Sequence, residues 1–224
     1  MINWLTIFIT LVKKDLLIEL KSKEIVITIT LFSLLVVSIF AITSNNPSNI
    51  SKDIGAGIIW ASVVFSGSIA MSKFFSHEEE NQTLSGVLLM PVPTELIFFS
   101  KASSLFIFLS ISEILILIVF SILFNLNALT FYIVVCAIIF NFGFSLIGTF
   151  FGTISSKSKS KEILLTLLMI PIIIPIIMFA TELTRYGLHK EAPENLNAWL
   201  GLGISFDIIF FVLLTFLFGK IIEE

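Results

Sequence analysis

Charged residues are scarce in this sequence. Asp, Glu, Lys and Arg make up 13% of its 224 residues and hydrophobic residues 57%, whereas about a quarter of the residues of a soluble domain are charged. The composition excludes an ordinary soluble domain and is typical of a chain that lies in lipid.

Residues that build disulfides, metal sites and catalytic centres are few. Cys136 is the single cysteine, so one chain forms no disulfide and no cysteine-rich metal site. The sequence has no Gly-rich phosphate loop ending in Gly-Lys-Ser/Thr and no His-Glu-x-x-His motif, and the stretch GFSLI at 143–147 lacks the final glycine of a nucleophile elbow. We therefore expect no catalytic residues and no enzyme, and if the protein uses ATP, another subunit must bind it.

Apolar runs of membrane length recur along the whole chain, separated by short polar joints. They predict an all-α polytopic membrane protein, a single domain over 1–224, with six transmembrane helices near 25–42, 54–71, 102–124, 129–154, 163–180 and 200–219. Four lysines precede the first full-length run, so we expect this span to be retained rather than cleaved as a signal peptide.

The basic residues predict the orientation, because loops on the cytoplasmic side carry an excess of Lys and Arg. Six spans put both termini on one side. Three basic residues fall on the opposite side: Lys52, Arg185 and Lys190. Ten fall on the side of the termini: Lys13, Lys14, Lys21, Lys23, Lys73, Lys101, Lys157, Lys159, Lys161 and Lys220. The bias predicts that both termini are cytoplasmic.

The N-terminal segment, 1–24, is expected to form an interfacial helix. Apolar residues recur in it at helical spacing, with polar residues mostly on other faces: Leu5, Phe8, Ile9, Val12, Leu16 and Leu20. The pattern is typical of an amphipathic helix in the cytoplasmic interface; the alternative is a basic anchor before the first span.

The second joint, residues 76–93, predicts a short amphipathic helix on the cytoplasmic side. Ser76 followed by Glu79 fits a capping box, and Pro91 and Pro93 would end the helix. Such a helix could lie on the membrane or fit a groove in a partner protein. The candidate contact residues are an acidic start and an apolar stripe followed by the prolines: Glu78, Glu79, Glu80, Leu84, Val87, Leu88, Pro91 and Pro93.

The fifth joint, 181–198, is the only sizeable segment predicted on the outer side. Its candidate residues are Arg185, His189 and the adjacent Trp199. It could close the outer end of a pathway or merely connect two spans. The two histidines, His77 and His189, fall on opposite sides, so they are not expected to hold one metal ion or haem together; each could supply one axial haem ligand or be a solvated loop residue.

Three features inside the spans stand out. Pro171 and Pro175 each remove an amide donor from the fifth span and predict a kink, which is either a hinge or a packing irregularity.

Glu113 and Asp207 should face protein or water, since an ionised carboxylate in lipid costs about 2.5 to 3.5 kcal/mol. They line a substrate path or proton site, or are protonated packing residues. In the fourth span, small and polar residues share a face that predicts a packing seam within the chain or between two copies: Asn141, Ser145, Gly148 and Gly152.

Several motifs resemble those of the heme exporter protein B family, a permease-like subunit of the cytochrome c maturation system. The second span begins with GAGIIW at 55–60; ENQTL at 80–84 and LLMPVP at 88–93, followed by Lys101, look like that family's acidic loop; the basic turn at 157–161 and the PIIIP segment at 171–175 also match. The likeness covers essentially the whole chain. It departs where Ala56 replaces an expected proline, and where Gln82 and Ser85 replace the usual Gly and Glu.

The resemblance implies an exporter-type (ABC-2) permease of the bacterial inner membrane, with the 76–93 segment as the coupling helix for an ATPase. It implies a cytoplasmic ATP-binding subunit, other cytochrome c maturation membrane proteins and a haem carrier as partners, with no nucleic acid. A second copy of the chain is a further candidate partner, through the packing seam of the fourth span. Haem would be a substrate and ATP would bind the partner subunit; the chain itself is expected to hold no metal. Two alternatives remain: an ABC exporter permease for a lipid or peptide, and a haem-binding scaffold without a transport cycle.

Overall fold

The computed structural model describes residues 4–43, 52–80, 86–87, 91–156, 161–189 and 195–223. The described part contains seven long helices, six of which are long and apolar enough to cross a membrane. The helices are α1 (Trp4–Ser22), α2 (Glu24–Thr43), α3 (Lys52–Glu80), α5 (Thr94–Phe124), α6 (Phe131–Ser156), α7 (Lys161–His189) and α8 (Leu196–Glu223). The prediction of an all-helical chain with six spans is confirmed.

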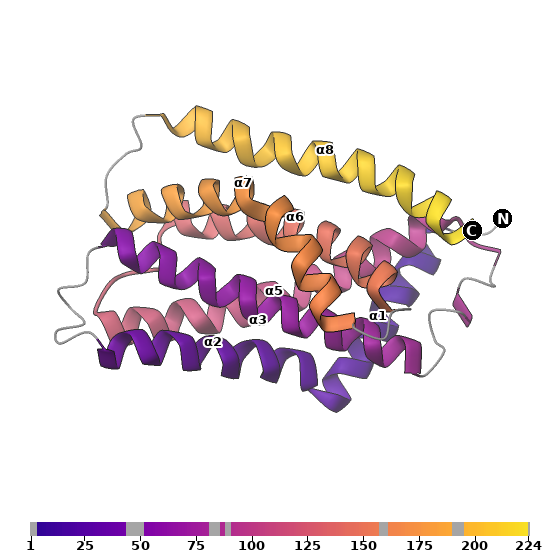
Figure 1. Ribbon diagram of the computed structural model, residues 1–224, viewed down its shortest axis with the longest axis horizontal. Helices are drawn as coiled ribbons and strands as arrows, with labels where there is room; N and C mark the ends of the chain where they lie inside the picture. Colours follow the sequence, from indigo (N-terminus) through magenta and orange to yellow (C-terminus); the bar gives the residue numbers. More distant parts are fainter. Residues whose placement is uncertain are drawn as a thin grey trace.

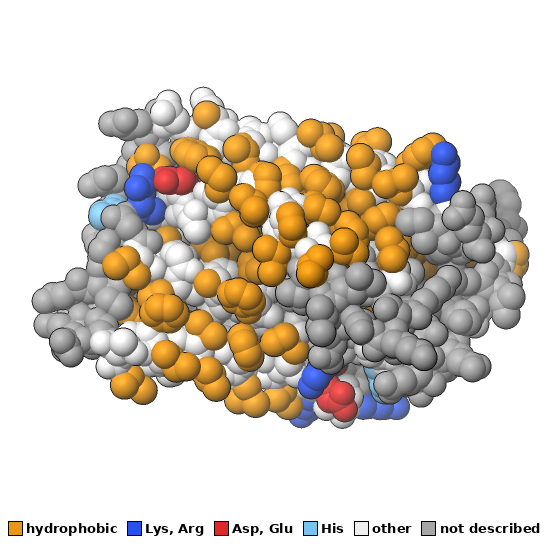
Figure 2. Space-filling view, in the orientation of Figure 1, with side chains coloured by type: hydrophobic (Ala, Val, Ile, Leu, Met, Phe, Trp, Pro, Cys, Tyr) orange, Lys and Arg blue, Asp and Glu red, His pale blue; other side chains and the backbone are white. Residues whose placement is uncertain are grey.

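The six apolar helices run along the long axis of the molecule, and α1 crosses one end of the bundle at an angle to them (Figure 1). Both chain termini lie at that end, called here the terminal end, as an even number of spans requires. The visible face carries hydrophobic side chains over its middle, with lysine and arginine near the two ends (Figure 2). This distribution suits a bilayer, in which a helix satisfies its own backbone hydrogen bonds and needs apolar side chains outside.

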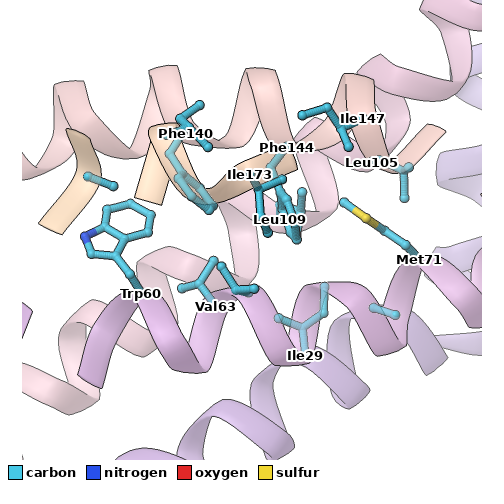
Figure 3. Close-up of a cluster of buried hydrophobic side chains, with 14 of the residues drawn as sticks. Ile29, Trp60, Val63, Met71, Leu105, Leu109, Phe140, Phe144, Ile147 and Ile173 are labelled. Carbon is cyan, nitrogen blue, oxygen red and sulfur yellow. The ribbon is translucent and has the colours of Figure 1, made fainter. Parts of the chain in front are cut away.

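Helices α3 and α6 form the centre of the bundle. In α3, 72% of the most apolar stretch is buried, compared with 28% in α2. Large side chains interlock between the helices, among them Trp60 and Met71 from α3, Phe140 and Phe144 from α6, and Ile173 from α7 (Figure 3). These side chains form a continuous packed core between the two ends of the bundle.

The predicted packing seam on α6 lies against α3 of the same chain. A Cβ atom on Gly148 would collide with the side chain of Met71, and one on Gly152 with the ring of Phe75. The two glycines let α3 side chains approach the α6 backbone, as small residues do between membrane helices.

Helix α7 continues through Pro171 and Pro175 without a break, and its axis bends along its length (Figure 1). The two prolines lack amide donors, so the carbonyl groups four residues before them have no helical partner, which explains the bend. The predicted kink is thus present in α7.

Three predicted boundaries are clearly wrong. Helix α3 runs through Ser76 to Glu80, so Ser76 does not cap a new helix, and Glu78 to Glu80 stand at the carboxyl end of α3 instead of a helix start. Helix α5 begins at Thr94, well before the predicted 102. Helix α7 continues to His189, which leaves a shorter outer joint than 181–198 and puts Arg185 in a helix. In each of these places a helix extends beyond the predicted span.

Candidate functional site

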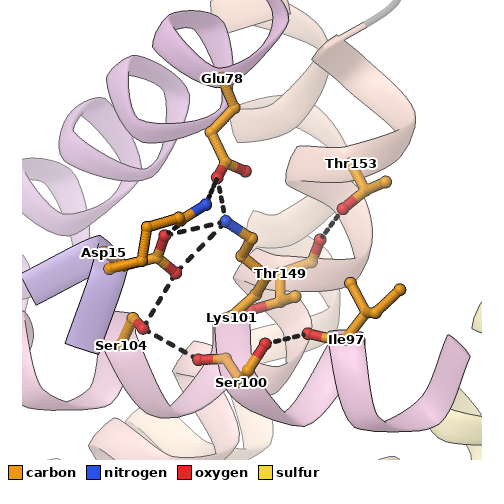
Figure 4. Close-up of polar contacts among 9 residues, drawn as sticks. Asp15, Glu78, Ile97, Ser100, Lys101, Ser104, Thr149 and Thr153 are labelled. Carbon is orange, nitrogen blue, oxygen red and sulfur yellow. Dashed lines mark hydrogen bonds and ion pairs between the residues drawn. The ribbon is translucent and has the colours of Figure 1, made fainter. Parts of the chain in front are cut away.

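Three charged side chains from three helices meet inside the terminal end of the bundle (Figure 4). Asp15 comes from α1, Glu78 from the end of α3 and Lys101 from the second turn of α5. Only 3%, 6% and 1% of their respective surfaces are exposed. We call these three residues, with Lys14, the ion cluster.

Lys101 is at the centre of the ion cluster. Its ammonium nitrogen lies 3.1 and 3.2 Å from the two carboxylate oxygens of Asp15 and forms a hydrogen-bonded ion pair with Glu78. Lys14, half-exposed, lies 3.0 Å from Asp15 and 3.8 Å from Glu78. Two cations therefore face two carboxylates, and the burial of charge is compensated within the cluster.

Polar and aromatic neighbours complete the surroundings of Lys101. The Ser104 hydroxyl lies 3.1 Å from Asp15 Oδ2 and 2.9 Å from the carbonyl oxygen of Ser100 and donates its single proton to one of them. The Phe74 ring centroid lies 5.2 Å from the Lys101 nitrogen, a distance at which the ring face attracts a cation. Together these contacts hold α1 and α3 against α5.

The joint between α3 and α5 is anchored beside the ion cluster. Val87 is buried in a small apolar cluster with Leu11 of α1 and Ile97 of α5. Pro93 directly precedes α5, and Pro91 and Pro93 are exposed. Of the predicted contact stripe, Leu84 and Leu88 lie outside the described residues, as do the side chains of Glu79 and Glu80.

Helices α1 and α2 meet at a tight corner next to the ion cluster. Lys23 adopts a left-handed backbone conformation with φ 57°, and the Glu19 carboxylate accepts a hydrogen bond of 2.9 Å from the amide of Val26 in the first turn of α2. Glu19 thus caps α2 and fixes its direction relative to α1. A cavity of about 460 Å³ opens beside the corner, lined by Asp15, Ile18, Glu19, Ser22, Glu24, Ile25, Lys73, Phe74, His77 and Glu78.

The ion cluster was not predicted as a unit. Lys101 was counted among the basic residues on the side of the termini, and Asp15 was not a candidate site residue. One signal was present: Leu11, Asp15 and Glu19 recur four residues apart and form the buried face of α1, whereas Leu5, Ile9 and Leu20 of the predicted apolar stripe are exposed. Among the described residues, no group of three or more His, Cys, Asp or Glu is suited to a metal ion.

The two intramembrane carboxyl residues are both buried in the bundle. Glu113 of α5 accepts a 2.6 Å hydrogen bond from Asn141 of α6. Asp207 of α8 lies against Gly143 of α6, and no described residue donates a hydrogen bond to its Oδ1 atom. A side chain on Gly143 would collide with Asp207. The two carboxyl groups therefore contact different residues of α6, Glu113 contacting Asn141 and Asp207 contacting Gly143.

The opposite end of the bundle carries the predicted outer residues. Arg185 forms an ion pair of 2.8 Å with Glu182 on the same helix. His189 is half-buried at the end of α7, and Trp199 is half-buried in α8 against the core. Nearby, Trp60 of α3 donates a 2.8 Å hydrogen bond to the Thr184 hydroxyl of α7.

Comparisons with known proteins match the chain almost from end to end. It is 26% identical over 164 residues to Heme exporter protein B of Rhodobacter capsulatus, covering 73% of this chain and 75% of the relative. It is 21% identical over 177 residues to Heme exporter protein B of Haemophilus influenzae, covering 79% and 80%. The model of the CcmB protein family matches residues 6–224. Because that match covers nearly the whole chain, including all six spans, the chain belongs to the CcmB protein family.

Proposed function

We propose that this protein is the membrane permease subunit of an ABC-type complex in cytochrome c maturation, where ATP use is linked to handling haem and releasing a haem-loaded carrier. The observation that carries the proposal is the family match over residues 6–224, together with two relatives named Heme exporter protein B. The six spans and the lack of a phosphate loop in the sequence support a non-catalytic subunit whose ATP is bound by a partner.

The segment 76–93 is the proposed docking site for a cytoplasmic ATPase. It joins two helices that the ion pair of Glu78 with Lys101 holds together, and Val87 packs against Leu11 of α1. A displacement of this segment would therefore reach α1, α3 and α5 at once. The exposed prolines Pro91 and Pro93 and the acidic residues Glu79 and Glu80 belong to the same proposed contact surface.

The rest of the bundle is proposed to carry that displacement to the other face of the membrane. The bent helix α7, with Pro171 and Pro175, serves as the hinge, because the two missing backbone hydrogen bonds make bending there less costly. Glu113 and Asp207 are the proposed polar positions along the way. Arg185, His189 and Trp199 form the proposed outer contact region for the haem carrier.

We propose that the protein lies in a bacterial inner membrane with both termini on its cytoplasmic side. The excess of basic residues at the terminal end supports this orientation. Reporter fusions at the N-terminus, within 157–161 and at the C-terminus should all report the cytoplasmic side, and a fusion within 190–194 the opposite side. A fusion at 157–161 that reports the side opposite the N-terminus would contradict the orientation.

The function is tested in a bacterium that lacks its own copy of the gene. The wild-type protein should restore c-type cytochromes, whereas a variant with Leu84→Asp and Leu88→Asp should not, and an ATP-binding subunit should co-purify only with the wild type. Leu129→Asp is the matched control, because Leu129 is an exposed leucine in the joint at the opposite end of the bundle. Unchanged ATPase association of the double variant would contradict the docking site.

The same strain separates the rival functions. An exporter permease for a lipid or peptide predicts normal c-type cytochromes in the deletion strain. A haem-binding scaffold predicts that the purified protein shows a haem absorption spectrum, that His189→Ala removes it, and that an inactive ATPase partner has no effect on maturation.

A further inference from the structure

The cavity beside the corner of α1 and α2 lies at the depth of the lipid head groups. Helix α2 is one of the six spans and has 20 residues, Glu24 to Thr43. At a rise of 1.5 Å per residue this length is about 30 Å, the thickness of the hydrocarbon core, so all of α2 is needed to cross it. Glu24 therefore stands at the boundary between acyl chains and head groups, and it lines the cavity.

Exposed apolar side chains lead away from the cavity along α2 and α3. On α2 they share a face with Glu24, and on α3 with Lys73, at spacings of four and seven residues. The Lys73 ammonium nitrogen lies 3.2 Å from the Thr28 hydroxyl of α2, so the two faces lie side by side. Along the lower edge of Figure 2, apolar side chains cover α2, and charged side chains and a histidine gather where α1 meets α2. We call the following side chains the apolar strip: Leu31 (62% exposed), Leu35 (54%), Phe65 (49%) and Ile69 (37%).

The cavity wall offers one cation and one anion at different depths. Lys73 is the deeper, because its ammonium nitrogen lies beside Thr28, four residues or about 6 Å further into the span than Glu24. The Thr28 hydroxyl accepts one of the three N–H donors of Lys73. Glu24 is exposed, and none of the described residues forms a hydrogen bond or ion pair with its carboxylate. The volume of about 460 Å³ lies within the range of ligand pockets, about 300–1,000 Å³.

A phospholipid whose head group ends in an ammonium group matches this order. Its phosphate is attached to the glycerol backbone and its ammonium stands further out, so the phosphate would meet Lys73 and the ammonium Glu24. Four carboxylates line the cavity, of which Asp15 and Glu78 are already paired in the ion cluster. The described basic residues in the wall are Lys73 and His77. A head group with a phosphate and no cation would therefore place another anion near the remaining carboxylates, which repel it.

We propose that the cavity and the apolar strip form a binding site for a phospholipid with a primary ammonium head group, a phosphatidylethanolamine. The phosphate pairs with Lys73, the ammonium donates hydrogen bonds to Glu24, and an acyl chain lies on the apolar strip. A quaternary ammonium, as in phosphatidylcholine, has no N–H to donate to Glu24. The site is independent of which molecule the complex moves and of the side of the membrane on which the terminal end lies.

The head-group preference is tested by native mass spectrometry of the full-length protein, delipidated in detergent. The protein is titrated with dioleoyl forms of phosphatidylethanolamine, phosphatidylcholine and phosphatidylglycerol, which differ only in the head group. We expect one tight site for phosphatidylethanolamine, with a Kd at least fivefold below those of the other two. Equal Kd values, or tighter binding of phosphatidylglycerol, would overturn the proposal. Glycerophosphoethanolamine, which lacks acyl chains, should bind at least tenfold more weakly, and equal binding would assign the cavity to a soluble ligand instead.

Two variants test the two charged contacts. Lys73→Met should raise the Kd for phosphatidylethanolamine at least fivefold, whereas Lys220→Met, at an exposed lysine of α8 near the same end, should change it less than twofold. Glu24→Lys should reverse the preference in favour of phosphatidylglycerol, because two cations then face the head group. Glu95→Lys is its control, since Glu95 is an exposed acid in the first turn of α5. A Kd unaffected by Lys73→Met, or an unchanged order of lipids in Glu24→Lys, would overturn the proposal.

Folding and the position of the acyl chain are measured on the same samples. Because Lys73 and Glu24 are exposed, the Tm of each delipidated variant should lie within about 2 °C of the wild type. Phosphatidylethanolamine should raise the Tm of the wild type and not that of Lys73→Met. One equivalent of the lipid with a photoreactive acyl chain should label the apolar strip. Labelling of the exposed face of α8 with the same yield would mean contact with bulk lipid only and would overturn the proposal.

Discussion

Replacing Lys101 by methionine should release α1 from the bundle. Methionine fills a similar volume, but Asp15 and Glu78 would remain buried without the ammonium group that they share. Removing one partner of a buried ion pair costs about 3–5 kcal/mol. Because Lys14 still lies 3.0 Å from Asp15, we expect a loss near the lower bound.

The expected change is large enough to measure by heating. About 3 kcal/mol corresponds to a fall in Tm of roughly 6–12 °C for a chain of this size. The assay is thermal unfolding of the purified protein in mild detergent, followed by hydrogen exchange to find where the loss acts. Relative to the wild type, the variant should show faster exchange of the α1 amides and little change in the α6 amides. The reason is that α1 depends on the ion cluster, whereas α6 lies in the core.

Lys73→Met is the matched control for this variant. Lys73 is exposed and its ammonium nitrogen lies 3.2 Å from the Thr28 hydroxyl, so its loss should change stability by no more than about 0.5 kcal/mol. Adding Lys14→Met, Asp15→Asn and Glu78→Gln to Lys101→Met should recover part of the loss, since no member of the ion cluster is then charged. A Tm for Lys101→Met equal to that of the control, or a further fall in the quadruple variant, would refute the reasoning.

Two other variants test contacts inside the spans. Asn141→Leu deprives Glu113 of its 2.6 Å donor and should lower stability by about 1–3 kcal/mol; adding Glu113→Leu should restore much of the Tm, and a purely additive double variant would contradict the pairing. Gly152→Leu places a side chain where the Phe75 ring lies and should lower stability by about 1–3 kcal/mol or more. The loss is measured as a fall in Tm, with Gly57→Leu as the control, because a Cβ at position 57 meets nothing within 4 Å. Equal effects of the two changes would contradict the seam.

The number of membrane spans and their helical structure could be predicted from the sequence, but the ends of the helices could not. Apolar runs indicate where a chain is immersed in lipid, whereas a helix ends only where the backbone turns away. The apolar run of the second span stops near Met71, yet α3 continues to Glu80. Ser76 and Glu79 matched a capping box by composition alone, and the same residues are also acceptable inside the last turns of a long helix.

The ion cluster could not be predicted because its members are far apart along the chain. Asp15 and Lys101 are separated by 86 positions, and periodicity describes only which residues of one helix share a face. Glu113 and Asn141 illustrate the same limit: each was recognised as unusual in a span, but their pairing depends on how α5 and α6 are rotated against each other. The seam at Gly148 was predictable as a seam, while its partner α3 was not.

The hydrogen bond between Trp60 and Thr184 makes α7 observable by optical means. The indole of Trp60 is fully buried and bonded to the bent helix, and the other two tryptophans, Trp4 and Trp199, lie on α1 and α8. With those two replaced by phenylalanine, emission would come from a single fluorophore at the contact of α3 with α7. Separation of these helices would expose the indole to water and shift its emission to longer wavelengths, so the emission maximum of this variant reports, without an added label, whether the contact between α3 and α7 opens.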